Sequence, residues 1–321
     1  MSPSKGMVTD MELIEIHECA SEADEQVSLD VHNVVWPQQA VTMAEVRSFK
    51  SRTRDCADFL AVLGGAAVGS AVVAILPQRP DRAFVLSTVL AEKRRLGVGS
   101  GLYQVVSQWA RDRSLELLWA PVEEDDSASI ALAQSRGFVE IERNRRMVLD
   151  LGSIEEPKVV PPAGITITSW AGRPELGRGI YEVATEAYAD VPAAEEDEME
   201  SFEDWLAHDM NGSGDLPEAT FVALAGDEVV GYAKFSLTRA RPTVAAHDMT
   251  GVKRAWRGRG IARALKCTQI SWAKRSGFER LETSNEVRNE PIRRLNAQLG
   301  YRIAPGRVLF EGPLAASESS T

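Results

Sequence analysis

A glycine-rich segment at residues 250–262 has the residue types of an anion-binding turn. It reads Thr-Gly-Val-Lys-Arg-Ala-Trp-Arg-Gly-Arg-Gly-Ile-Ala and leads into a helical pattern with Ile261, Leu265, Thr268 and Trp272 on one face. Glycines let the backbone approach a ligand, and the free N–H groups of a helix's first turn favour a phosphate. A plain strand-to-helix connection is the alternative interpretation. The segment lacks the Lys-Ser/Thr ending of a nucleotide P-loop and the pattern Gly-x-Gly-x-x-Gly, which argues against nucleotide hydrolysis and NAD binding.

Basic side chains gather around these glycines in a chain that is otherwise acidic. They are Lys253, Arg254, Arg257, Arg259 and Arg263. The whole chain has 36 Lys and Arg residues against 47 Asp and Glu residues, a net charge of −11. This balance argues against nucleic acid as a partner, because nucleic-acid binding depends on neutralising phosphates. We expect the basic cluster to attract the phosphates of a small ligand.

The motif occurs twice, which indicates an internal repeat. An offset of 163 residues superposes three pairs of segments: 94–99 on 257–262, 109–111 on 272–274, and 136–138 on 299–301. A hairpin-like pattern of two apolar runs precedes each motif, at 59–75 and at 221–235. Each half then reads as a strand, a helical segment, two hairpin strands, a fourth strand, a helix, a strand, a helix and a closing strand.

A proline-rich interruption separates the two halves. Residues 151–164 include Glu-Glu-Pro and Pro-Pro-Ala-Gly and show no apolar periodicity before a new strand at 165–167. At 321 residues the chain suits two domains, which we place at 1–152 (the N-terminal half) and 161–314 (the C-terminal half). The element pattern predicts the α/β class, with a mixed, mostly antiparallel central sheet flanked by helices in each domain.

Both motifs fit the pattern Gln/Arg-x-x-Gly-x-Gly/Ala, and the chain thereby resembles the GCN5-related N-acetyltransferases (GNAT). Residues 283–301 also look like that family's second cofactor segment, and the tandem layout is similar to that of mycothiol synthase. The resemblance implies acetyl-CoA as the co-substrate, with Val252 pairing its backbone with the pantetheine arm and the amides of 258–262 holding the pyrophosphate. It implies cofactor contacts at Val252, Arg257, Gly258, Arg259, Gly260, Ile261, Ala262 and Asn289, and at Arg94, Gly97 and Gly99.

Asn289 has a second interpretation. Glu-Pro follows it in the sequence, and proline is common in the first turn of a helix, so Asn289 is also a candidate helix N-cap. One residue can do both.

The catalytic groups depart from the family pattern. Direct acetyl transfer needs a group that takes the proton of the amine and a donor that protonates the departing thiolate. The family's usual base position is held by Ala246, but Asp248 should share its face of the strand unless a bulge intervenes, so Asp248 is our candidate base. A hydrogen-bond acceptor at a strand end is the alternative for Asp248. The family's tyrosine acid is replaced by Asn296, which leaves the acid unassigned, with Tyr301 and Tyr232 as alternatives.

The N-terminal half has no visible base. The matching strand face holds Ala83, Val85, Ser87 and Val89, and Asp126 stands where the C-terminal half has Asn289. We therefore predict that the N-terminal half is non-catalytic, although its glycine turn retains the features for binding CoA.

An acidic segment at 193–205 precedes the hairpin of the C-terminal half. Together with Phe202 and Trp205 it could attract and stack against a cationic amine, or it could be a solvated face.

These features predict an N-acetyltransferase that moves an acetyl group from acetyl-CoA to a primary amine of a small, cationic metabolite or antibiotic. The alternatives are a non-catalytic acyl-CoA-binding module and a mycothiol-synthase-like enzyme, and a longer acyl donor stays open. The three cysteines lack disulfide or zinc spacing, so no metal is expected. Without a signal peptide or an apolar stretch of membrane-spanning length, we expect a cytoplasmic protein. The sequence does not distinguish a monomer from a homodimer.

Overall fold

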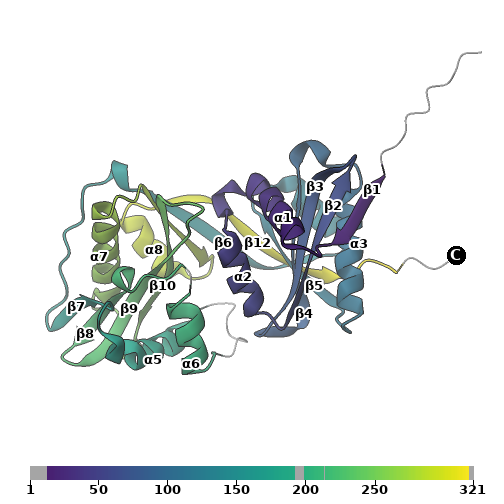
Figure 1. The fold of residues 1–321 in the computed structure, drawn as a ribbon. Coiled ribbons are helices and arrows are strands. Elements are labelled where there is room, and N and C mark those ends of the chain that lie inside the picture. The colour runs from purple at the N-terminus through teal and green to yellow at the C-terminus, as the bar shows by residue number, and fades with distance from the viewer. Residues whose placement is uncertain (1–12, 192–198, 213, 318–321) are drawn as a thin grey trace, which may run out of the picture.

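The computed structural model describes residues 13–191, 199–212 and 214–317 (Figure 1). The first half of the chain forms these elements in order: β1 (Ile14–Glu18), α1 (Glu22–Val35), α2 (Met43–Ser51), β2 (Asp55–Leu63), β3 (Ala66–Leu76), β4 (Arg79–Val89), α3 (Val98–Arg111), β5 (Leu117–Glu123), α4 (Ser127–Ser135) and β6 (Val139–Asp150). Ser21 and Thr42 begin α1 and α2 with capping boxes, which fixes where these two helices start.

The second half repeats this order, which confirms the predicted α/β class and the repeat. Its elements are β7 (Ile165–Ser169), α5 (Gly177–Tyr188), α6 (Phe202–Trp205), β8 (Phe221–Ala225), β9 (Glu228–Leu237), β10 (Val244–Val252), α7 (Ile261–Arg275), β11 (Arg280–Glu286), α8 (Glu290–Gln298) and β12 (Arg302–Pro313). Within the described residues no helix is both long enough and apolar enough to cross a membrane.

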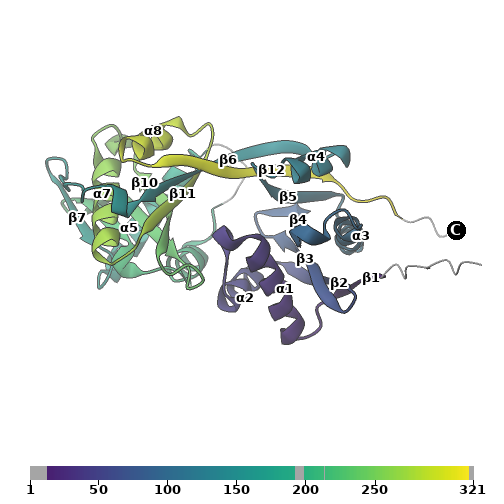
Figure 2. The same cartoon turned by 90° about the horizontal axis from the view of Figure 1, so that it is seen from above.

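The twelve strands of the described residues belong to one sheet, in the order β1-β2-β3-β4-β5-β12-β6-β11-β10-β9-β8-β7. The pairs β4–β5 and β10–β11 are parallel, and the other neighbours are antiparallel. The mixed, mostly antiparallel sheet predicted for each half is therefore present as two lobes joined side by side. Figure 2 shows β6 and β12 running along each other across both lobes.

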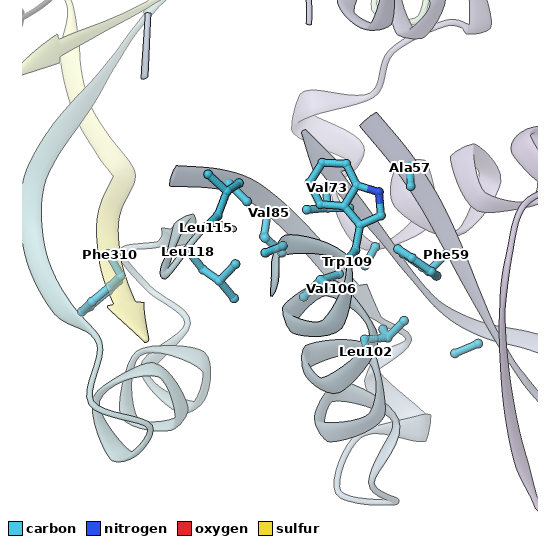
Figure 3. Packing of buried hydrophobic residues seen from close by; sticks show 14 of the residues in the cluster. Ala57, Phe59, Val73, Val85, Leu102, Val106, Trp109, Leu115, Leu118 and Phe310 are labelled. Atoms are coloured by element: carbon cyan, nitrogen blue, oxygen red, sulfur yellow. The ribbon is translucent and has the colours of Figure 1, made fainter. Parts of the chain in front are cut away.

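The closing strands are exchanged between the halves. Strand β12 lies between β5 and β6, and β6 lies between β12 and β11, so each lobe contains the other half's last strand. Phe310 of β12 is buried in the core of the first lobe (Figure 3). In return Met147 and Leu149 of β6 pack with Phe235 and Leu281 in the second lobe. The sequence segments 1–152 and 161–314 therefore describe the repeat along the chain, whereas each lobe in space draws on both.

Each exchanged side chain adds an ordinary increment of core stability. Burying a Phe, Leu or Met side chain contributes about 1.5–3 kcal/mol. Figure 3 shows the core that receives Phe310, where Val106 and Trp109 of α3 pack against Phe59 and Val73 of the sheet. The exchange thus adds stabilisation that depends on both halves at once.

Candidate functional site

A cleft opens where β10 and β11 diverge. The two strands pair in parallel from Val244–Arg280 to His247–Thr283, and no further pair follows. Strand β11 continues to pair with β6 as far as Glu286, and β10 with β9 as far as Val252. Beyond the last pair lies a cavity of about 730 Å³. The facing backbone edges are left for a ligand to pair with, and the pairing that the resemblance implies for Val252 stays a prediction.

The glycine-rich turn forms one end of this cleft. Gly258 and Gly260 have φ angles of +74° and +85°, in the left-handed region that favours glycine. Helix α7 begins at Ile261, and its N-cap residue, Gly260, has no side chain with which to cap it. The N–H groups of its first turn have no acceptors within a helix, so they can bind an anion. Arg257 Nε donates to the Val252 carbonyl at 2.9 Å and fastens the turn to the strand.

The cleft brings together most of the predicted site residues. Those that line it are Asp248, Val252, Arg257, Gly258, Gly260, Ile261, Ala262 and Asn289. Arg259 is not among the lining residues, and its guanidinium lies over the Trp256 ring, 4.7 Å from the centroid. Its predicted role in binding the cofactor therefore rests on its backbone amide alone.

Acidic partners hold most of the basic cluster in place. Asp190 binds Arg254 at 2.7 Å and Arg257 at 2.6 Å. The hydrogen bond from Arg254, reinforced by Arg257, lowers the pKa of Asp190 to about 2. Lys253 pairs with Glu182 and Glu228 at 3.3 and 3.1 Å. Of the five basic residues, Arg257 and Arg263 line the cleft.

Asn289 stands at the N-cap position of α8, but its side chain makes no capping hydrogen bond. It lines the cleft. The helix-capping interpretation of its side chain therefore fails on the geometry, and the amide is placed to contact a ligand instead.

Asp248 lies in a β-bulge. The register between β10 and β9 shifts between His247 and Met249, which inserts Asp248 as an extra residue. The bulge breaks the alternation expected from 246 to 252. Asp248 contacts Lys234, whereas Val252 packs with Ile261 of α7. Both residues nevertheless line the same cleft.

A buried lysine orients the Asp248 carboxylate. Lys234 Nζ lies 2.9 Å from Asp248, 3.0 Å from Asp215 and 3.5 Å from Asp209. Its side chain is 2% exposed, whereas that of Asp248 is 43% exposed and so reaches the cleft. Burial alone would lower the pKa of Lys234, but the three carboxylates outweigh it and raise that pKa. Burial raises the pKa of Asp209 and Asp215, and Lys234 partly offsets the rise.

Neither predicted tyrosine is placed as a free acid in the cleft. Tyr301 is buried and its hydroxyl bonds to Nε2 of His247. Tyr232 is fully buried, and its hydroxyl has no partner among the described residues. Asn296, at the place of the family's tyrosine, is also buried and donates to Asn285 Oδ1 at 2.9 Å.

Sequence reasoning missed Lys266, which lines the cleft at the base of α7. This residue is 1% exposed, and no ion pair to it is found in the described part of the chain. Its Nζ lies 5.7 Å from the centroid of the Tyr301 ring. Burial lowers the pKa of Lys266 to about 7. Helical spacing already groups Lys266 with the buried residues Ile270 and Ala273, a signal that could have identified it.

His247 borders Lys266 and is equally enclosed. Its Nδ1 bonds to Gln269 Oε1 at 2.9 Å. Burial, together with the nearby Lys266, holds the pKa of His247 well below its usual value. The pair therefore places two basic groups of lowered pKa in the lining of the cleft.

In the N-terminal half, side chains in the matching region pair with one another, and they line a smaller cavity of about 200 Å³. Gly97 keeps the left-handed conformation at φ +95°, and Arg94 bonds back to the Val89 carbonyl at 3.4 Å, as Arg257 does to Val252. Arg94 also pairs with Asp126 at 3.2 Å. Gln39, which follows α1, donates to Glu123 at the end of β5 at 2.5 Å.

Asp126, in contrast to Asn289, caps its helix by accepting from the Ser129 amide at 3.0 Å. The cofactor contacts predicted at Arg94, Gly97 and Gly99 stay a prediction.

The structure describes only part of the acidic segment that was predicted to face the acceptor. Residues 193–198 lie outside the described residues. Trp205 is 3% exposed and belongs to the core beside α5, with Phe202 packed against that core. Arg178 lies over the Phe202 ring, 3.9 Å from the centroid. Trp205 is therefore a core residue, which corrects its predicted part in a substrate-stacking surface.

Comparison with solved structures supports the fold. A GCN5-related N-acetyltransferase from Sphaerobacter thermophilus is 22% identical, with 97% of this chain and 98% of that chain covered and a TM-score of 0.73. A tandem GNAT protein from the clavulanic acid biosynthesis pathway is also 22% identical, with coverages of 95% and 100% and a TM-score of 0.76. No curated protein sequence matches the chain.

A family model described as the acetyltransferase (GNAT) family matches residues 17–138 and again residues 178–301. Each match contains one glycine-rich turn with its left-handed glycine, and together the matches span most of the sequence. The chain is therefore an acyltransferase that belongs to the acetyltransferase (GNAT) family, with two tandem domains of that fold.

Proposed function

We propose that this enzyme moves an acetyl group from acetyl-CoA to the primary amine of a small cationic molecule, and that it does so in the C-terminal cleft. The observation that carries the proposal is the meeting of three features in one cavity. The glycine turn supplies backbone amides for a pyrophosphate, and Asp248 supplies a carboxylate. Asn289 supplies a side-chain amide that is not used to cap α8. The cavity has a volume of about 730 Å³, which lies within the range of pockets that bind cofactors and other small molecules.

Asp248 is the proposed base. The amine nitrogen forms a bond to the acetyl carbon while the carbon–sulfur bond breaks, and Asp248 takes the proton that the amine loses. Lys234 holds the carboxylate in the bulge, so its free oxygen has a fixed direction. Fixing a catalytic group in this way removes the entropic cost of finding the reactive geometry.

Lys266 is the proposed proton donor to the departing thiolate. It lines the cleft, and no carboxylate is paired with it among the described residues. A pKa of about 7 means that it can give up a proton near neutral pH and take one back from water. Lys266 would thereby take over the role of the family's tyrosine acid, whose position in this sequence is occupied by Asn296.

The test is a calorimetric titration of acetyl-CoA into the wild-type chain and two matched variants, Gly260→Glu and Gly97→Glu. A carboxylate at Gly260 would face the pyrophosphate and strain a left-handed position, so we expect affinity to fall by about 100-fold or more. The Gly97 variant should bind like wild type. Release of free thiol with a panel of amines then reports transfer.

Each outcome separates the readings. Loss of binding in the Gly260 variant alone, with thiol release for some amine, supports transfer in the C-terminal cleft. Loss in the Gly97 variant alone would place the cofactor in the N-terminal half. Binding without release for any amine would favour the acyl-CoA-binding module.

A further inference from the structure

A second cavity, of about 550 Å³, lies between the two lobes. Helices α1 and α2 with strands β3 and β4 form one wall, and β9, β10 and β11 form the other. Thr238, which follows β9, donates to Glu45 of α2 at 2.8 Å and ties the walls together. Neither half alone encloses this inter-lobe cavity.

The inter-lobe cavity and the cleft meet at one residue. Ser284 lines both. It directly follows Thr283, the last residue of β11 that pairs with β10. The two cavities therefore approach each other from opposite sides of the point where the strands diverge, which is where a thioester in the cleft and an amine in the inter-lobe cavity could meet.

Three buried polar atoms in residues that line the inter-lobe cavity have no hydrogen-bond partner among the residues that the structure describes. Asp58 Oδ1 and Gln39 Oε1 are acceptors from the N-terminal wall, and Arg241 Nε is a donor from the C-terminal wall. Asp58 is 5% exposed, and its other oxygen is paired with Lys50 at 2.7 Å. Buried polar groups are rarely left unpaired, so these atoms indicate a ligand that donates at one end and accepts at the other.

The charge and the apolar surface of the lining restrict the chemical class of the ligand further. The lining has five carboxylates against four Lys and Arg side chains, so a ligand with one positive charge would balance it. Phe49, Phe84, Leu86 and Val46 supply apolar surface between the two ends. Because Ser284 and Arg241 stand on the same wall, the ligand's amine and its hydrogen-bond acceptor should be close together.

We propose that the inter-lobe cavity holds the acceptor of the acetyl group, and that this acceptor is a cationic α-amino amide with an apolar body and a second hydrogen-bond donor at its far end. The amine lies toward Ser284, the amide carbonyl accepts from Arg241, and the far donor reaches Asp58. The acceptor role rests on the proposed function, whereas binding in the cavity does not.

L-Tyrosinamide has each of these groups and serves as the probe. Its matched controls are tyramine, which lacks the carbonyl, L-phenylalaninamide, which lacks the hydroxyl, and L-tyrosine, which carries a carboxylate. Calorimetry measures binding of each probe to the CoA-loaded chain. We expect L-tyrosinamide to bind most tightly and each missing group to weaken binding by about tenfold, since it leaves a buried partner unsatisfied.

Two variants of β4 locate the binding site. Leu86→Trp fills the inter-lobe cavity, and Ser87→Trp places the same side chain one residue away, on an exposed position outside its lining. We expect the first to abolish L-tyrosinamide binding and the second to leave it unchanged, with acetyl-CoA affinity equal in both. Val46→Phe fills the same space from α2 and replaces the first variant if that one melts early.

The outcomes divide cleanly. Failure of L-tyrosinamide to bind, or binding that survives Leu86→Trp and Val46→Phe, overturns the proposal. Cavity binding without acetylation in the presence of bound acetyl-CoA overturns the acceptor role. Cavity binding in a chain that does not bind acetyl-CoA would leave the ligand site standing while the proposed function fails.

Discussion

The two glycine turns have the same backbone shape but different surroundings. In both, an arginine bonds back to the preceding strand and a left-handed glycine begins the helix. In the C-terminal half the turn borders an open cleft. In the N-terminal half Asp126 pairs with Arg94, and Gln39 donates to Glu123 at the end of β5. The glycine pattern thus specifies the turn, whereas a few distant side chains set the lining of the cavity beside it.

The sharpest difference between the halves is the carboxylate at the bulge. Asp248→Asn keeps the shape of the side chain but removes the proton acceptor. We expect kcat to fall by about 10²- to 10⁴-fold, with acetyl-CoA affinity unchanged. Asp215→Asn is the control, since Asp215 touches the same Lys234 without lining the cleft. Equal losses in the two variants would reduce Asp248 to a structural partner of Lys234.

Lys266 and Tyr103 occupy matching places in the repeat, and of the two only the lysine should make stability rise with pH just above neutral. Burial lowers the pKa of Lys266 from 10.5 to about 7, so between these values the unfolded chain holds a proton that the native chain lacks. Stability therefore rises with pH through this window, by up to about 1.4 kcal/mol per unit. The titratable groups that face the Lys266 amine are His247 and Tyr301.

Urea denaturation at several pH values measures this slope. Lys266→Met should remove it and stabilise the chain at pH 7. Tyr103, which donates to the Pro313 carbonyl at 2.8 Å, provides the control variant Tyr103→Met, in which the slope should persist. An unchanged slope in the Lys266 variant would contradict the buried, unpaired amine.

Asn289 and Asp126 stand at the N-caps of equivalent helices, but only the Asp126 side chain caps its helix. Asn289→Ala should weaken acetyl-CoA binding by about tenfold, the cost of one lost hydrogen bond, with little change in unfolding free energy. Asp126→Ala should lose about 1 kcal/mol of stability, because its side chain caps α4, and should leave cofactor affinity alone. Calorimetry and denaturation on both variants test the contrast, which reversed effects would refute.

The smallest effect concerns Arg95, which has φ +64° where the C-terminal turn has Gly258 at +74°. A non-glycine residue in this region carries strain. Arg95→Gly should therefore stabilise the chain, by up to about 1 kcal/mol after the entropic cost of glycine. Gly258→Ala should lose a similar amount. Denaturant midpoints measure both, and a destabilised Arg95 variant would argue that the arginine makes compensating contacts.

The fold and the turn could be predicted because they follow from local rules. Left-handed positions select glycine, and apolar periodicity selects strands and helices, so Gly97 and Gly260 mark the turns directly. The position of Asp248 needed the bulge, which depends on how β10 registers with β9. Lys234 and Lys266 were missed because a lysine is ordinarily exposed, and only the assembled core shows these two buried.

The exchange of closing strands was beyond the sequence pattern for a different reason. An apolar alternation predicts that a segment is a strand but carries no information about which of two similar sheets it joins. Strand β6 could pair beside β5 or beside β11 with nearly the same pattern. The inter-lobe cavity depends on that choice, so it too was out of reach.

The exchange also dictates an order of assembly. Strand β5 gains its outer neighbour only from β12, which lies roughly two hundred residues later in the sequence. During synthesis the β5 edge of the first lobe therefore stays unpaired, and the core of that lobe stays incomplete, until almost the whole chain has been made. Such long-range closure slows folding and exposes a strand edge to other chains. Cutting the chain between the repeats should leave two pieces that need each other, and co-expression would be the way to recover them as a complementing pair.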